Sequence, residues 1–311
     1  MLNEKIVVHI DPAIGSTNLG DEVISEAVAR HIKLMFPEAR IINIASRDIG
    51  KWAKGVLKAA DTIIFGGSNA LSANPVLGYR QFAMGFMQYL GVRNVTLMGV
   101  GWWQYQDSFG PFAQTFYKKV LRHDIIHSVR DEYTLTKLKA LGFEGALNTA
   151  CPTMWSLDSF ETGVSENVVV TLTDYNRNFD RDLALLSKSL EKFNRVYFWP
   201  QGTRDNQYLQ TFSSVIDLQR IELIKPNLQA LDDVLHSGAC YAGTRLHAGI
   251  RALQFKRPSF IIPIDNRAVE IAKMEHLTLV NPALETVEVG AKFNFSHTAK
   301  PEIQQFLNQF R

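Results

Sequence analysis

The sequence predicts an α/β protein made of two Rossmann-like domains, each built on a parallel sheet. Short, nearly continuous apolar runs alternate with segments of helical periodicity, which is typical of parallel strands covered by helices on both faces. The alternation breaks between about residues 148 and 165 and then resumes. We therefore expect an N-terminal domain over residues 1–150 and a C-terminal domain over residues 151–311. Ligands of such sheets bind outside the carboxyl ends of the strands, so we expect a cleft between the domains to hold the site.

The first half contains five predicted strands. Asp21 begins a helix that Pro37 ends, and Gly142 ends the last helix of this half. Further helices are expected near residues 52–57, 80–90 and 112–121. The expected strands are Ile6–Ile10, Ile41–Ile44, Thr62–Phe65, Val95–Met98 and Ile125–Val129.

The second half repeats this pattern after a segment that reads as loop and linker. Helices are expected over residues 182–193 and 267–274 and after the Cys240 strand. The tail, residues 301–310, is expected to form a last amphipathic helix that packs back on the first domain. The expected strands are Val168–Leu172, Val196–Trp199, Ile221–Ile224, Cys240–Tyr241 and Phe260–Ile262.

Composition excludes several classes of protein. The net charge is +2, from 33 Lys plus Arg against 31 Asp plus Glu, which gives no general attraction to nucleic acid. No apolar run approaches the length of a membrane span, and the N-terminal apolar run is too short for a secretory signal. Two widely separated cysteines are expected to be reduced thiols of a cytoplasmic protein. The histidines have no ligand spacing, so we expect no metal.

The stretch Gly243-Thr244-Arg245-Leu246-His247 carries the strongest functional signal. It joins a predicted strand to a predicted helix, which places Arg245 and His247 in the first helical turn. Backbone N–H groups there lack partners and the helix dipole is positive, so a carboxylate or phosphate would bind well. The alternative is that Arg245 pairs with a neighbouring acid and His247 packs at a domain seam.

Three more candidate segments follow strands of the first half. Asn18, Gly20 and Asp21 lie in a loop after the first strand, where the glycine allows a close approach of ligand to backbone. Asp21 could equally only charge the start of its helix. Gly66, Gly67 and Ser68 follow the third strand and suit a ligand-binding loop or simply a tight turn.

Arg130 follows the fifth strand. Its planar guanidinium suits a carboxylate or phosphate, and the alternative is a salt bridge to Asp131 or Glu132.

In order along the chain, Gly15–Glu22, Asp61–Ser68, Ser128–Thr134 and Thr244–His247 resemble the motifs of the polysaccharide pyruvyl transferase family. The resemblance spans roughly Lys5 to Lys273. It implies an architecture similar to GT-B glycosyltransferases, with two domains about a central cleft. One departure stands out: Cys151 precedes Pro152 where many relatives have Asp-Pro.

The resemblance implies that the protein transfers the pyruvyl group of phosphoenolpyruvate to a sugar of a cell-surface polysaccharide or its precursor, forming a pyruvate ketal. Arg130, Arg245, Leu246 and His247 then look like the phosphoenolpyruvate site. An imidazole can give and take protons near neutral pH, so we expect His247 to be catalytic. Asn18, Gly20, Asp21, Gly66, Gly67 and Ser68 look like the acceptor side of the cleft.

No cofactor beyond the donor substrate is expected. The acceptor would be a sugar or a lipid-linked oligosaccharide, and the latter would bring the protein into peripheral contact with the inner membrane face. Two other functions stay open at this stage. One is a GT-B glycosyltransferase that uses a nucleotide sugar, although no acid pair for a nucleotide is evident. The other is a glycan- or anion-binding protein without activity.

Overall fold

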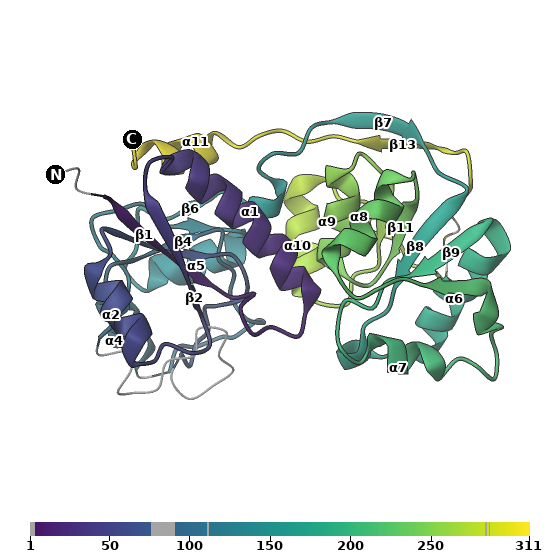
Figure 1. Cartoon of the computed structure of the whole chain (residues 1–311), viewed down its shortest axis with the longest axis horizontal. Coiled ribbons are helices and arrows are strands. Elements are labelled where there is room, and N and C mark those ends of the chain that lie inside the picture. The colour runs from purple at the N-terminus through teal and green to yellow at the C-terminus, as the bar shows by residue number, and fades with distance from the viewer. Residues whose placement is uncertain (1–3, 76–90, 111, 284, 286) are drawn as a thin grey trace. The chain divides into compact units, whose positions relative to one another are not determined.

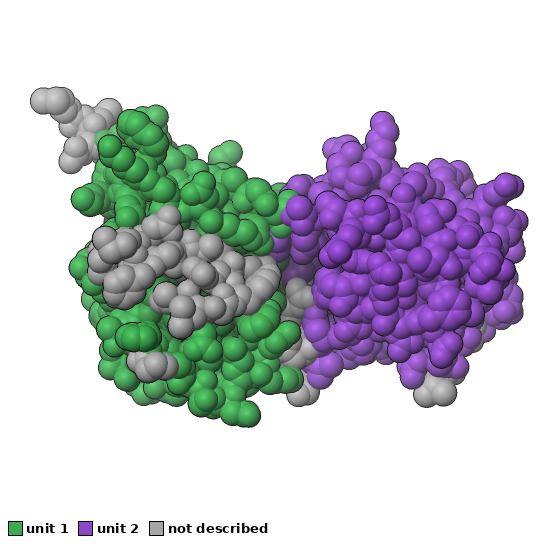
Figure 2. Space-filling view, turned by 90° about the horizontal axis from the view of Figure 1, so that it is seen from below, with its two compact units in different colours: residues 1–16, 24–155, 299–311 green, residues 17–23, 156–298 purple. Residues whose placement is uncertain are grey.

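The computed structural model describes residues 4–75, 91–110, 112–283, 285 and 287–311 (Figure 1). The chain divides into two compact units, coloured separately in Figure 2. The first unit holds residues 1–16, 24–155 and 299–311, and the second holds residues 17–23 and 156–298. The predicted helix over residues 80–90 lies outside the described residues.

A four-stranded parallel sheet in the order β2-β1-β3-β4 forms the centre of the first unit. The strands β5 and β6 form a short parallel pair, and a single parallel bridge between Val100 and Val129 lies beside it. The bounds are β1 Ile6–Asp11, β2 Arg40–Ala45, β3 Thr62–Gly66, β4 Val95–Met98, β5 Ser128–Val129 and β6 Leu147–Asn148.

Alternate side chains of this sheet enter two separate apolar cores. Val8 lies in one core, which also contains buried residues of α2, α4 and α5. Val7 lies in the other, with residues of α1 and α11. Helices therefore cover both faces of the sheet, as the apolar strands predicted. The helices are α1 Leu19–Met35, α2 Lys51–Ala59, α4 Ala113–Val120, α5 Glu132–Ala140 and α11 Pro301–Asn308.

The second unit contains a five-stranded parallel sheet in the order β10-β9-β8-β11-β12. Its strands are β8 Asn167–Thr171, β9 Arg195–Phe198, β10 Ile221–Leu223, β11 Cys240–Gly243 and β12 Ser259–Ile261. Its helices are α6 Phe179–Lys192, α7 Asp205–Gln210, α8 Leu228–His236, α9 Leu246–Gln254 and α10 Asn266–Glu275. Short 3₁₀ turns cover Pro152–Met154 in the first unit and Asp174–Asn176 and Leu218–Arg220 in the second.

Both parallel sheets confirm the predicted α/β class, and two local predictions were wrong. The strand expected over Ile125–Val129 is limited to Ser128–Val129, because the ring of His127 takes the place of backbone pairing. Its Nδ1 accepts a hydrogen bond from the backbone N–H of Leu97 at 3.1 Å, and its Nε2 bonds to the carbonyl of Arg122 at 2.8 Å.

The segment expected to be a linker contains a strand. β7, Phe160–Gly163, pairs antiparallel with β13, Lys292–Phe295, and the two run side by side in Figure 1. Among the described residues, no helix combines the length and the apolarity needed to cross a membrane.

Candidate functional site

Arg245 lies at the junction between β11 and α9, as the sequence predicted. Its backbone is extended and α9 begins one residue later, so His247 occupies the first turn. The hydroxyl of Tyr241 holds this junction: it accepts from the N–H of Arg245 at 3.0 Å and donates to the carbonyl of the same residue at 2.7 Å. Burial raises the pKa of Tyr241, so this hydroxyl stays protonated.

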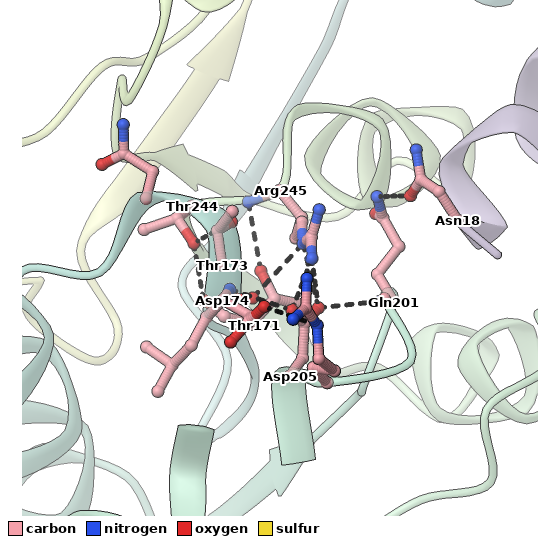
Figure 3. A network of polar contacts seen from close by, with 12 residues as sticks. Asn18, Thr171, Thr173, Asp174, Gln201, Asp205, Thr244 and Arg245 are labelled. Carbon is pink, nitrogen blue, oxygen red and sulfur yellow. Dashed lines mark hydrogen bonds and ion pairs between the residues drawn. The ribbon is translucent and has the colours of Figure 1, made fainter. Parts of the chain in front are cut away.

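The side chain of Arg245 forms a buried ion pair with Asp205 (Figure 3). Its Nε lies 3.0 Å from Oδ2 of Asp205, and its Nη2 lies 2.5 and 2.6 Å from the two carboxylate oxygens. The pairing that the sequence left as an alternative is therefore present. Both contacts use one edge of the guanidinium, and Nη1 has no hydrogen-bond partner among the described residues.

Asp205 was not identified from the sequence as the partner of Arg245. Its side chain is fully buried at the start of α7, and it also accepts from the backbone N–H groups of Gly202 at 2.8 Å and Asp174 at 3.1 Å. A side chain at position 202 would meet the guanidinium, because an added Cβ would lie 2.5 Å from Nη2 of Arg245. The position of Asp205, shortly after a predicted strand and Gly202, was the signal in the sequence that could have identified it.

A small cavity lies against Arg245 in the second unit. Its volume is about 20 Å³, which holds roughly one water molecule, so any substrate has to widen it. The guanidinium carbon of Arg245 lies 5.0 Å from the ring centre of Tyr175, a cation–π contact. His247 is 5% exposed. The cavity is lined by Asn18, Tyr175, Gln201, Thr244, Arg245, Leu246, His247, Ile264, Asp265 and Ala268.

The segment with Asn18, Gly20 and Asp21 belongs to the second unit and reaches the same cavity through Asn18. Oδ1 of Asn18 accepts from the N–H of Gly20 at 3.2 Å, at the start of α1. Nε2 of Gln201 donates to the same oxygen at 2.7 Å (Figure 3). Asp21 is buried in the first turn of α1. The structure thus brings Asn18 together with Arg245, Leu246 and His247.

Arg130 forms a second arginine site within the first unit. It is 2% exposed, its Nε donates to Oδ2 of Asp131 at 3.1 Å, and its Nη2 donates to Oδ1 of Asn69. An added Cβ at Gly101 would lie 2.2 Å from Nε, so the guanidinium packs directly on that glycine. Nη1 again has no hydrogen-bond partner among the described residues.

The loop of Gly66, Gly67 and Ser68 lies beside Arg130 through Asn69. The packing of α1 accounts for both glycines: an added Cβ would lie 2.3 Å from Val28 at position 66 and 2.1 Å from Ile24 at position 67. Gly67 and Ser68 both have positive φ, 64° and 65°. Ser68 is buried and its carbonyl accepts from the N–H of Gly101 at 2.8 Å.

Cys151 is buried in the first unit. The hydroxyl of Thr153 lies 3.1 Å from its sulfur. Both cysteines are free thiols. Over the described ranges, no group of His, Cys, Asp and Glu is arranged to hold a metal ion.

Comparison with known proteins agrees with the motifs. The family model described as polysaccharide pyruvyl transferase matches residues 18–266, which include Arg130, the Asp205 pair and the Arg245–His247 segment. A comparison with curated proteins found no match. Because the family model covers well over half of the chain, the protein belongs to the polysaccharide pyruvyl transferase family.

Proposed function

We propose that this protein transfers the pyruvyl group of phosphoenolpyruvate to a sugar of a cell-surface polysaccharide or its precursor, with release of phosphate. Membership of the family supports a transferase that acts on polysaccharide. The observation that carries the donor assignment is the shared state of two buried arginines. Arg130 and Arg245 are each held through Nε and Nη2, and each keeps Nη1 without a protein partner among the described residues.

Phosphoenolpyruvate is a small anion with a carboxylate and a phosphate. Arg245 is the residue that precedes α9, at a helix N-terminus where unpaired N–H groups and the helix dipole favour negative charge. A guanidinium that its partner already orients loses little side-chain entropy on binding. The proposal includes a GT-B-like arrangement in which Arg130 of the first unit completes the donor site.

The proposed chemistry starts with protonation of the methylene carbon of the donor, which leaves an oxocarbenium-like centre. One sugar hydroxyl adds to that centre and loses its proton. The bond to the phosphate oxygen breaks, and a second hydroxyl of the same sugar closes the ketal. Two hydroxyl protons are released: one restores the acid and the other leaves with phosphate. His247 is assigned as this acid, because it lies on the cavity wall beside Arg245.

Two measurements test this function. Thermal-shift assays compare phosphoenolpyruvate with a panel of nucleotide sugars, and we expect stabilisation by phosphoenolpyruvate alone. Phosphate release from phosphoenolpyruvate is then followed with sugar glycosides as acceptors. Stabilisation by a nucleotide sugar would instead favour a glycosyltransferase. Binding of phosphoenolpyruvate without phosphate release, over a broad panel of acceptors, would favour a protein that binds anions without turnover.

A lipid-linked oligosaccharide acceptor would bring the protein to the inner membrane face. Co-sedimentation with vesicles that contain such a lipid tests this part of the proposal. The proposed reaction uses no cofactor apart from its donor substrate.

A further inference from the structure

The carboxamide of Gln201 has an unpaired hydrogen-bond acceptor that binding of phosphoenolpyruvate does not explain. Gln201 is 4% exposed and lines the cavity beside Arg245. Its Nε2 donates to Oδ1 of Asn18 at 2.7 Å. Its Oε1 is buried and has no hydrogen-bond partner among the described residues. The amide nitrogen of Gln201 is therefore hydrogen-bonded, whereas its amide oxygen is not.

The hydrogen-bond network fixes which end of the carboxamide is the oxygen. The Asn18 atom that faces Gln201 also receives the backbone N–H of Gly20 at 3.2 Å, so it has to be an oxygen. The Gln201 atom 2.7 Å away from it must then be the nitrogen, because two oxygens would repel. The backbone of Gln201 is also held here, since its carbonyl accepts from the N–H of Leu19 at 3.0 Å.

A buried acceptor without a partner is unfavourable and uncommon in native proteins. Gln106 in the first unit shows how a structural carboxamide is satisfied. Its Oε1 accepts from the N–H of Ala73 and from the indole N–H of Trp102, both at 2.8 Å. Gln201 lines the cavity beside Arg245, so its unpaired oxygen indicates a ligand that supplies a hydrogen-bond donor.

Ionised phosphoenolpyruvate carries only acceptors, so it cannot supply that donor. A sugar carries several hydroxyl donors. Building on the proposed function, we propose that Oε1 of Gln201 accepts a hydrogen bond from a hydroxyl of the acceptor sugar, next to the donor held by Arg245. Gln201 would then be a determinant of acceptor specificity in the second unit. Because the cavity is water-sized, the sugar has to widen it to reach this oxygen.

The test uses Gln201→Leu, with Gln207→Leu as the matched control, since Gln207 is exposed in the next helix of the same segment. Calorimetry gives the Kd for phosphoenolpyruvate, and saturation-transfer NMR gives the Kd for a panel of methyl glycosides. We expect Gln201→Leu to weaken glycoside binding about tenfold and to change phosphoenolpyruvate binding by less than about twofold. Gln207→Leu should change neither.

A second variant tests whether glycoside binding depends on the oxygen itself and not on a change in folding. Gln201→Glu keeps an acceptor oxygen but replaces Nε2 with a second oxygen that repels Oδ1 of Asn18, and it adds a negative charge near Arg245. It should bind glycosides more tightly than Gln201→Leu does, although less tightly than the wild type, while it weakens phosphoenolpyruvate binding by about tenfold or more. Unchanged glycoside binding in Gln201→Leu would overturn the inference. A wild-type protein that binds glycosides through Gln201 but does not bind phosphoenolpyruvate would instead overturn the proposed function and leave this inference standing.

Discussion

The two arginine sites each hold a buried guanidinium with a carboxylate, but the carboxylates come from different parts of the chain. Arg130 and Arg245 each follow a strand, precede a helix and use the Nε–Nη2 edge for protein contacts. Arg130 pairs with the next residue, Asp131, whereas Arg245 pairs with Asp205, forty positions earlier in the chain. The first site is therefore local in sequence, and the second depends on two strand-to-helix connections that meet only in the fold.

This difference has an energetic consequence. Oδ1 of Asp131 also caps α5 by accepting from the N–H of Thr134 at 2.7 Å, so Asp131 keeps a role without Arg130. Asp205 is fully buried, and among the described residues Arg245 is the cation that pairs with it. Breaking a buried pair by removing one partner leaves a buried charge and is strongly destabilising.

The largest expected effect concerns His247, which lines the same cavity as Arg245. His247→Gln should lower kcat by about 10²–10⁴-fold while the Kd for phosphoenolpyruvate changes little, because a general acid acts in the transition state. Steady-state kinetics together with calorimetry checks this split. Equal losses in kcat and in binding would show that His247 only binds the donor.

The next effect is a difference in stability between variants of the two arginines. Arg245→Ala should lower the free energy of unfolding by about 3–5 kcal/mol, and Arg130→Ala by about 1–3 kcal/mol. Chemical denaturation checks the difference. The double variant Arg245→Met/Asp205→Asn removes both charges, keeps one acceptor oxygen for the backbone N–H groups that Asp205 binds, and should recover part of the stability without recovering binding of phosphoenolpyruvate. A control is Asp232→Asn, which weakens the pair of Arg251 with Asp232 near the other end of α9. Equal destabilisation by both alanine variants would show that the Arg245–Asp205 pair contributes no more to stability than the Arg130–Asp131 pair.

A smaller effect is expected at the loop next to Arg130. Gly67→Ala should destabilise the protein by about 2–4 kcal/mol, since it combines a positive φ of 64° with a contact of 2.1 Å to Ile24. Gly15→Ala is the matched control, because its φ is 73° and no atom lies within 4 Å of an added Cβ. The control should cost about 1 kcal/mol. If both substitutions cost the same, backbone conformation alone explains Gly67.

The last effect is a pH dependence located in the first unit. Burial lowers the pKa of His127 to about 4, from an ordinary value of 6.5 in the unfolded chain. The unfolded state therefore binds the extra proton first, so stability is complete above pH 6.5 and falls as the pH drops toward about 4. The loss approaches about 3 kcal/mol.

Denaturation of the wild type and of His127→Gln between pH 7 and pH 4 checks this. The variant should be less sensitive to acid, because it lacks the group that takes up the proton. Equal slopes of stability against pH in both proteins would show that His127 does not contribute.

Most of the architecture followed from periodicity. Apolar strands with glycine-rich ends predicted both parallel sheets, and Gly142, with φ of 97°, lies just past the end of α5 as expected. The β7–β13 pair was missed because its strands lie about 130 residues apart, and neither is marked by a continuous apolar run. Local periodicity carries no information about such pairing.

The site was predictable in part. The helix-start position of Arg245 and His247 followed from their neighbours in sequence. The partner of Arg245 and the pairing of Asn18 with Gln201 did not, since each joins segments that are distant in the chain. Gly66 and Gly67 were considered as parts of a ligand loop, and their contacts with α1 give them a packing role that sequence spacing does not reveal.

The most direct test of the central claim is the crystal structure of the protein in complex with phosphoenolpyruvate. We expect a carboxylate or phosphate oxygen about 2.7–2.9 Å from Nη1 of Arg245, with the Asp205 pair intact on the other edge. Phosphoenolpyruvate bound away from Arg245, with Nη1 in contact with water only, would contradict it.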